Sequence, residues 1–275
     1  MQKTTAPFKA IIATITLTGK AGKSVMANNL LLPRMPGAKL FRMETFNESG
    51  AAGNNAVIEN MKGRELEKLL KGLGKVDSAV VDIGTSNVEN FLLGLAQDGG
   101  AQNIFDYFVV PVESNSAKIN EFKEFVKIVN TLKDLGVQPD RIKVVFNKHL
   151  PDNEIKSEMA RVFNYHASFP IFSINERAVI HETELFKALG AAKKSYEEML
   201  LDNNDYYKML KETPLDKTIE RETIIRMARA QGLVRGIDIE LNSVFSELFG
   251  LKKAPSAKTT EFSIADSTID VSDFE

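Results

Sequence analysis

The sequence predicts an α/β fold in which a mostly parallel sheet carries helices on both faces. Short β-branched runs alternate with longer stretches of helical apolar spacing over residues 8–180, the pattern of βαβ units. The strand-like runs are almost uniformly apolar, as is typical of strands covered on both sides. With 275 residues, 43% of them apolar and 26% charged, the chain can bury a large core.

The elements follow one another in a regular order. Strands are predicted at 8–17, 39–44, 78–83, 107–112 and 142–147, with a weaker one at 169–172. Helices are predicted at 24–32 (ended by Pro33), 64–73, 88–95 and 117–135. Further helices are expected at 182–200, 216–231 and 237–249. Because ligands of such sheets bind at the carboxyl ends of the strands, functional residues are expected directly after strands.

Composition excludes several classes of protein. The absence of cysteine excludes a disulfide scaffold, a cysteine-ligated zinc site and a thiol nucleophile. With 35 basic and 37 acidic residues the net charge is −2, which excludes a polycation of the histone type. Three scattered histidines do not suggest a metal site. Without a signal-peptide pattern or a long apolar run, the protein is expected to be soluble and cytoplasmic, with no membrane span.

A glycine-rich turn joins the first predicted strand to the first helix. Residues 17–24 read Leu-Thr-Gly-Lys-Ala-Gly-Lys-Ser, which matches the second half of the phosphate-loop pattern G-x-x-x-x-G-K-[ST]. Its glycines let backbone N–H groups point inward, the lysine can reach the β- and γ-phosphates, and the serine hydroxyl can ligate Mg²⁺. The alternative is a plain turn capped by Ser24. The predicted cofactor-binding set here is Gly19, Lys20, Ala21, Gly22, Lys23, Ser24 and Val25, with Lys23 also catalytic.

Two later strand ends complete the predicted site. Asp82 ends the apolar strand 78–83, where a carboxylate can hold Mg²⁺ beside the phosphate loop, and Gly84 can donate an N–H to the γ-phosphate. The alternative for Asp82 is a cap of the helix that begins near Ser86. Asn147 ends a late strand, where it can contact the base. Because Leu150 stands where a guanine-reading motif has aspartate, adenine is favoured, and the alternative is a turn asparagine.

Together these motifs resemble the ParA/MinD group of deviant Walker ATPases, over residues 8–190. Residues 18–48 are further similar to the StbB plasmid-stability proteins, above all in the loop, in the Leu-Leu-Pro-Arg-Met-Pro-Gly-Ala segment at Leu31–Ala38 and in the region Glu44–Asn47. The resemblance implies a P-loop NTPase fold of the deviant Walker type, ATP and Mg²⁺ as ligands, and slow hydrolysis. Ser24 and Asp82 would hold the metal, and Glu44 or Glu48 would orient the attacking water, unless Glu44 is simply a surface acid at a strand end.

The resemblance also bears on assembly, because the group's signature lysine crosses to the partner subunit in an ATP-dependent homodimer. That position is Thr18 here, and Lys20 is the nearest replacement.

The pattern along the chain predicts a nucleotide-binding domain at 1–200, a helical extension at 201–250 and a disordered tail at 251–275. The tail holds three lysines against five acids.

The resulting functional hypothesis is an ATPase switch in plasmid stability, partition or conjugative transfer, with a plasmid-encoded DNA-binding or conjugation protein as partner. One alternative is a nucleotide-gated scaffold with little hydrolysis. Another is a metabolic kinase or synthetase, which would require a substrate pocket near 113–120, where the sequence shows no convergent catalytic acid. Nonspecific DNA binding has weak support from four arginines for which a solvated face is favoured: Arg221, Arg226, Arg229 and Arg235.

Overall fold

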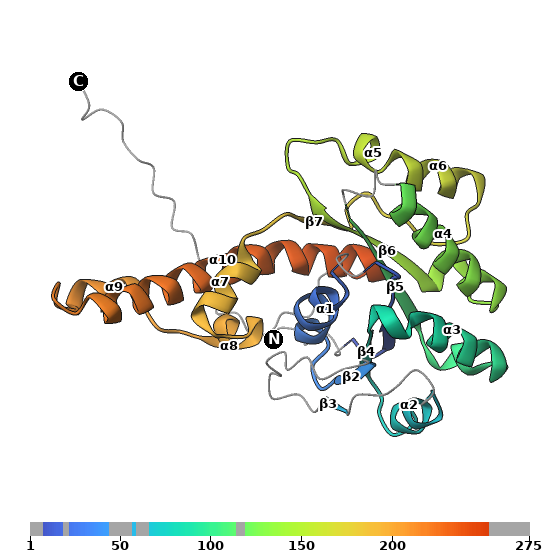
Figure 1. Cartoon of the computed structure of the whole chain (residues 1–275), viewed down its shortest axis with the longest axis horizontal. Coiled ribbons are helices and arrows are strands. Elements are labelled where there is room, and N and C mark those ends of the chain that lie inside the picture. The colour runs from blue at the N-terminus through green and yellow to red at the C-terminus, as the bar shows by residue number, and fades with distance from the viewer. Residues whose placement is uncertain (1–7, 19–21, 44–56, 59–65, 114–118, 253–275) are drawn as a thin grey trace.

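The computed structural model describes residues 8–18, 22–43, 57–58, 66–113 and 119–252 (Figure 1). They form a seven-stranded sheet in the order β3-β2-β4-β1-β5-β6-β7, and every pair of neighbouring strands is parallel. The strands are β1 (Ile11–Thr14), β2 (Lys39–Met43), β3 (Val57–Ile58), β4 (Ala79–Ile83), β5 (Tyr107–Glu113), β6 (Ile142–His149) and β7 (Val179–His181). The predicted α/β class with a parallel sheet is confirmed.

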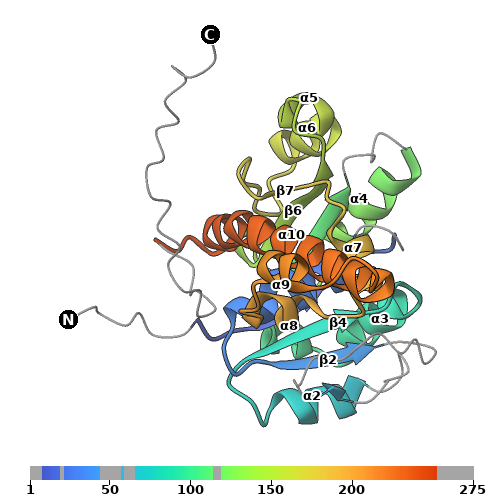
Figure 2. The ribbon, with the colours of Figure 1, turned by 90° about the vertical axis from the view of Figure 1, so that its left-hand side faces the viewer.

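Helices cover both faces of this sheet (Figure 2). One face carries α2 (Leu66–Leu73), α3 (Val88–Gln97), α4 (Ile119–Asp134), α5 (Ile155–Glu158) and α6 (Ala160–Ser168). The other face carries α1 (Lys23–Val25) and the turn after it, α7 (Leu185–Ala192), α8 (Tyr196–Leu201), α9 (Tyr206–Glu212) and α10 (Thr218–Phe249).

Each central strand contributes to two separate hydrophobic cores. Ile12 packs into the core beneath α10, whereas its neighbour Ala13 packs into the core beneath α3 and α4. In the same way, Val80 packs into the first of these cores and Val81 into the second. Because successive side chains of a strand point to opposite faces, both positions must be apolar when both faces are covered. This arrangement explains why the strand sequences show no polar alternation.

Two predictions about the later elements are wrong. Residues 169–172 form no strand, and the last strand is β7, which pairs with β6 across an irregular register near Asn147 and His149. The predicted helix 182–200 is two helices, because Lys193 takes a left-handed conformation with φ of 52°. The second of them, α8, starts at a capping box made by Ser195 and Glu198.

The predicted helices 216–231 and 237–249 are one continuous helix, α10, of 32 residues. Glycines at 232 and 236 lie inside this helix, since an interior glycine is tolerated where tertiary packing fixes the helix. In Figure 1, α10 crosses the sheet and continues beyond it, where α9 lies beside it. None of the helices among the described residues is long and apolar enough to cross a membrane.

The helix predicted at 24–32 has an unusual form. After α1 the chain winds as a π-helical turn, Met26–Leu31, and ends in a 3-10 turn, Leu32–Arg34, that includes Pro33. Arg34 is fully buried below this turn, where its guanidinium donates to the carbonyl oxygens of Asn29 (2.7 Å) and Leu30 (3.2 Å). The same guanidinium pairs with Asp238 of α10 at 2.5 Å. The segment after the glycine-rich turn is therefore tied directly to α10.

The predicted division near residue 200 stays a prediction. Val234 and Phe245 of α10 are buried in the same core as Ile12 of β1, so this helix forms part of one layer of the molecule. Residues 253–275, which hold most of the predicted disordered tail, lie outside the described residues.

Candidate functional site

The carboxyl ends of β1 and β4 meet beside the start of α1. In the parallel register Thr14 stands opposite Asp82, and both side chains are buried. The Thr14 hydroxyl lies 3.4 Å from Asp82 Oδ1 and from the carbonyl oxygen of Val81. Asp82 is therefore fixed at the end of a central strand, at the place where the sequence predicted a metal-binding carboxylate.

Lys23 projects from the first turn of α1 into this corner. The residue is only 7% exposed, and its Nζ donates to Thr85 Oγ1 at 2.6 Å and to the carbonyl oxygen of Thr18 at 3.5 Å. Burial lowers the pKa of the Lys23 amine below 10.5, and the negative charge of Asp82 acts against that lowering. The structure thus brings together Lys23 and Asp82, as predicted, and adds Thr85.

Thr85 was missed by the sequence reasoning. It opens the 3-10 turn Thr85–Asn87, directly after Gly84, and so stands at the carboxyl end of β4. Its position could have been found from the sequence Asp-Ile-Gly-Thr, because a hydroxyl two residues beyond the end of a parallel strand lies at the edge where ligands bind.

The electrostatic coupling of Lys23 and Asp82 gives a testable result. Replacing Asp82→Asn removes the charge that supports the ammonium form, so the pKa of Lys23 is expected to fall further below 10.5. The measurement is an NMR titration of the lysine Cε and Hε signals in the nucleotide-free protein. Lys156 serves as the control, because its pairing with Glu176 raises its pKa and should do so equally in both proteins. An unchanged Lys23 titration in the variant would contradict the coupling.

Gly22 occupies a position that requires glycine. Its φ of 89° is left-handed, and its carbonyl accepts from the Met26 N–H at 2.9 Å as the turn begins. A Cβ at Gly22 would lie 2.4 Å from Nδ2 of Asn147. The glycine-rich turn and the end of β6 therefore pack in direct contact, and the predicted phosphate-binding and base-contacting residues are neighbours.

A cavity of about 370 Å³ opens beside these residues. Its polar side is formed by Gly22, Lys23 and Asn147, and its apolar side by residues of β7, α7 and α10. This volume and mixed lining are typical of small-molecule sites. The remaining lining residues are Val25, Asn29, Lys148, Ile180, His181, Glu182, Thr183, Leu185, Phe186, Ile237 and Leu241. Val25, which was predicted for the site, lines the cavity, whereas none of the lining residues beyond 150 was predicted to belong to the site.

For the other predicted site residues, the structure shows no direct place at the cavity or does not describe the side chain. The Gly84 N–H donates to the carbonyl oxygen of Met43 at 2.7 Å, so it is engaged within the protein, and its contact with a phosphate stays a prediction. Of Ser24 only the backbone, in α1, is described. Four predicted residues lie outside the described residues, as does Glu48: Gly19, Lys20, Ala21 and Glu44.

The late arginines have partners within the chain. Arg221 donates to the carbonyl oxygens of Leu210 (2.8 Å) and Thr213 (2.6 Å), at the end of α9. Arg229 pairs with Glu184 at 3.2 Å. Arg226 contacts Thr223, and Arg235 donates to the carbonyl of Asp202. Arg221 therefore links the end of α9 to α10, whereas the contact of Arg226 stays within α10 and the pair of Arg229 is exposed.

Two of the three histidines pair with carboxylates. His149 Nδ1 lies 2.6 Å from Glu158 Oε2, and His181 Nδ1 lies 2.9 Å from Glu240 Oε2. Within the described part of the chain, no group of three or more histidine or acidic side chains could hold a metal ion.

No protein-family model matches the chain, and no curated protein matches it either. Among solved structures, Cyanothece McdA(D38A) in complex with ATP is 13% identical, covering 89% of this chain and 98% of its own, with a TM-score of 0.45. MinD of Aquifex aeolicus is 13% identical, covering 80% and 95%, with a TM-score of 0.43. A Borrelia burgdorferi protein described as a plasmid partition protein, bound to AMPPNP, is 15% identical, covering 80% and 98%, with a TM-score of 0.42. The similarity to these structures is a similarity of fold alone. The site described above is defined only by the geometry of this protein.

Proposed function

We propose that this protein binds Mg-ATP at the carboxyl edge of its sheet and hydrolyses it slowly, as a nucleotide-dependent switch. The observation that carries the proposal is the buried ammonium of Lys23, which lines the 370 Å³ cavity, donates to Thr85 and lies within the electrostatic influence of Asp82. A buried cation is costly unless it meets negative charge. Triphosphate is a ligand that supplies such charge and also fits an opening lined by glycine.

The phosphate end of the ligand would lie at the start of α1. Gly22 leaves room for close approach, and the amides at the start of the helix direct partial positive charge toward the ligand. Asp82 and Ser24 are the proposed Mg²⁺ ligands. Since Mg²⁺ takes few protein carboxylates and completes its shell with phosphate oxygens and water, a single buried aspartate fits its chemistry.

The base would occupy the apolar half of the cavity. Ile180, Leu185 and Leu241 provide the apolar wall, and the Asn147 amide can both donate to and accept from a base edge. Adenine is the proposed base because Leu150 provides no carboxylate for guanine and is 45% exposed.

The cellular role rests on the sequence resemblance of residues 18–48 to StbB proteins. On that ground we propose a role in plasmid stability, partition or conjugative transfer, exercised through a plasmid-encoded partner protein. ATP-dependent homodimerisation belongs to the same proposal, with Lys20 in place of the lysine that the related group has at position 18. DNA binding through the late arginines receives no support from their contacts within the chain.

The test is calorimetric titration of the full chain with ATP and GTP, each with and without Mg²⁺, together with measurement of phosphate release. Mg-ATP is expected to bind more tightly than Mg-GTP, and phosphate release is expected to be slow but above background. Binding without phosphate release would favour the nucleotide-gated scaffold over the ATPase. Absence of heat with every nucleotide would overturn the proposal.

A further inference from the structure

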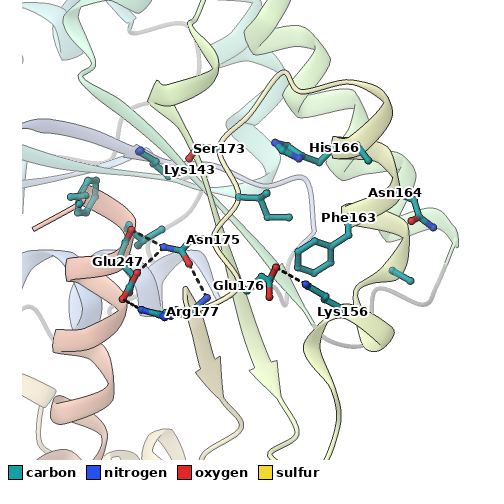
Figure 3. A pocket seen from close by; sticks show the side chains of 16 residues that line it. Lys143, Lys156, Phe163, Asn164, His166, Ser173, Asn175, Glu176, Arg177 and Glu247 are labelled. Carbon is teal, nitrogen blue, oxygen red and sulfur yellow. Dashed lines mark hydrogen bonds and ion pairs between the residues drawn. The ribbon is translucent and has the colours of Figure 1, made fainter.

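A second cavity, of about 990 Å³, lies beside the start of β6 (Figure 3). Lys143, near the start of β6, lines it, whereas Asn147 at the proposed nucleotide site is near the other end of the same strand. Three segments form its walls: α6, residues 173–177 and the end of α10. The two cavities are thus separated by the length of β6.

The wall of this cavity combines apolar groups with three basic and two acidic side chains, so basic groups are in excess by one. Burial lowers the pKa of Lys143, whose Nζ lies 5.5 Å from the centre of the Tyr107 ring. Lys156 and Arg177 stand on the rim, paired with Glu176 at 2.9 Å and Glu247 at 3.4 Å (Figure 3). Apolar surface is provided by Phe163, Ile174 and Leu248, among others. Such a wall suits a segment that offers both carboxylates and apolar side chains.

The chain itself carries a segment of that kind. After Lys258 it has no further basic residue, and residues 261–275 contain five acids interspersed with five large apolar side chains. The acids are Glu261, Asp266, Asp270, Asp273 and Glu275, and the apolar residues are Phe262, Ile264, Ile269, Val271 and Phe274.

The starting point of this segment is at the cavity. Phe249 and Gly250 line the cavity, and the described chain ends two residues later at Lys252. The stretch from Lys252 to Glu261 can span up to about 30 Å when extended. A short tether of this kind holds a segment at an effective concentration of roughly millimolar, so even weak complementarity is enough for occupancy.

We propose that residues 261–275 dock into the cavity lined by Lys143, Phe163 and Arg177 of the same chain. Their carboxylates face the basic groups, and Phe262 and Ile264 cover the apolar surface of α6. The docked segment then covers the end of α10. This proposal is independent of nucleotide binding and is tested without nucleotide.

Because the sequence contains no cysteine, disulfide trapping in the full chain is free of background. Ala167→Cys places a thiol on the exposed lining of the cavity, and Ser263→Cys places one in the segment. The matched control pairs Ser263→Cys with Ser243→Cys, an exposed position on α10 that is outside the cavity lining and about 10 Å along the helix from Gly250. In dilute protein the 167–263 bridge is expected to form within one chain about ten times faster than the 243–263 bridge.

Two results would overturn the proposal. Equal rates for the two pairs would show a free tether, and bridges found only between chains would identify a second copy as the occupant. The charge contribution is tested with Glu261→Gln and Asp266→Asn together, which are expected to slow the 167–263 bridge, as is an increase in salt from about 0.05 M to about 0.5 M. The reaction of the thiol at position 263 with a small reagent controls for altered reactivity. A rate insensitive to both changes would also contradict docking through these carboxylates.

Discussion

Arg34→Ala is expected to destabilise the protein by about 3–5 kcal/mol, because it breaks a buried ion pair and leaves the other charge without its partner. The side chains of Arg34 and Asp238 are 0% and 5% exposed, and their closest atoms are 2.5 Å apart. Removal of the guanidinium also leaves the carbonyl oxygens of Asn29 and Leu30 without this donor. Since globular domains are stable by only about 5–15 kcal/mol, this is a large fraction of the total.

Asp238 belongs to a larger buried network of hydrogen bonds. Asp238 also accepts from the Tyr196 hydroxyl at 2.7 Å and from the Asn242 side chain at 3.0 Å, and burial raises the pKa of Tyr196. Asp238→Asn keeps an oxygen that can accept from Arg34 and Tyr196, but it leaves the buried guanidinium of Arg34 without a counter-charge, so it should also be strongly destabilising. The double variant Arg34→Ala with Asp238→Ala should cost less than the sum of the two single alanine variants, since neither charge is then left alone.

Urea unfolding provides the measurement, with the midpoint compared at constant slope. Lys71→Ala is the matched control, because its ion pair with Glu67 is exposed and its loss should leave the midpoint unchanged. If the effects of Arg34→Ala and Asp238→Ala were strictly additive, the two residues would not act as a pair.

Lys23→Ala is expected to weaken Mg-ATP binding about a hundredfold, since a hydrogen-bonded charge contributes up to about 3 kcal/mol and each 1.4 kcal/mol is roughly a factor of ten. The expectation follows from the burial of Lys23, because a charge interacts more strongly with phosphate where water is excluded. Phosphate release should fall to background in the same variant.

The matched control for this variant is Lys39→Ala. Lys39 is an exposed lysine at the start of β2, so it lies at the amino edge of the sheet, away from the proposed site. Its replacement should leave both binding and phosphate release unchanged. Equal binding by the wild-type protein and Lys23→Ala would contradict the assignment of Lys23 to the phosphates, even if nucleotide still bound elsewhere.

The parallel sheet and the corner of the proposed site were predictable because they depend on local pattern. Strands with apolar residues at successive positions are expected to be buried on both faces. This pattern correctly placed β1, β4, β5 and β6 in the interior of the sheet. Lys23 and Asp82 were predictable for a related reason, since residues that follow parallel strands meet at one edge.

Predictions failed where long-range packing outweighed local preference. The strand expected at 169–172 has suitable residues, but in this region the chain pairs with the start of β6 only through a single bridge at Ser173, and β7 pairs with the later part of β6. Continuity of α10 through Gly232 and Gly236 depends on burial of Val234, Asp238 and Leu241 against the rest of the fold, which no local pattern reveals.

By itself, the sequence determined the fold class, the glycine-rich turn and the chemistry gathered at the end of β4, because these follow from residue type and spacing along the chain. The tertiary structure alone decided that Asn147 contacts Gly22, that α10 closes the apolar side of the cavity, and that Arg34 joins the turn after α1 to α10. Each of these contacts joins residues far apart in sequence, so its free energy depends on how whole elements pack and not on any local preference.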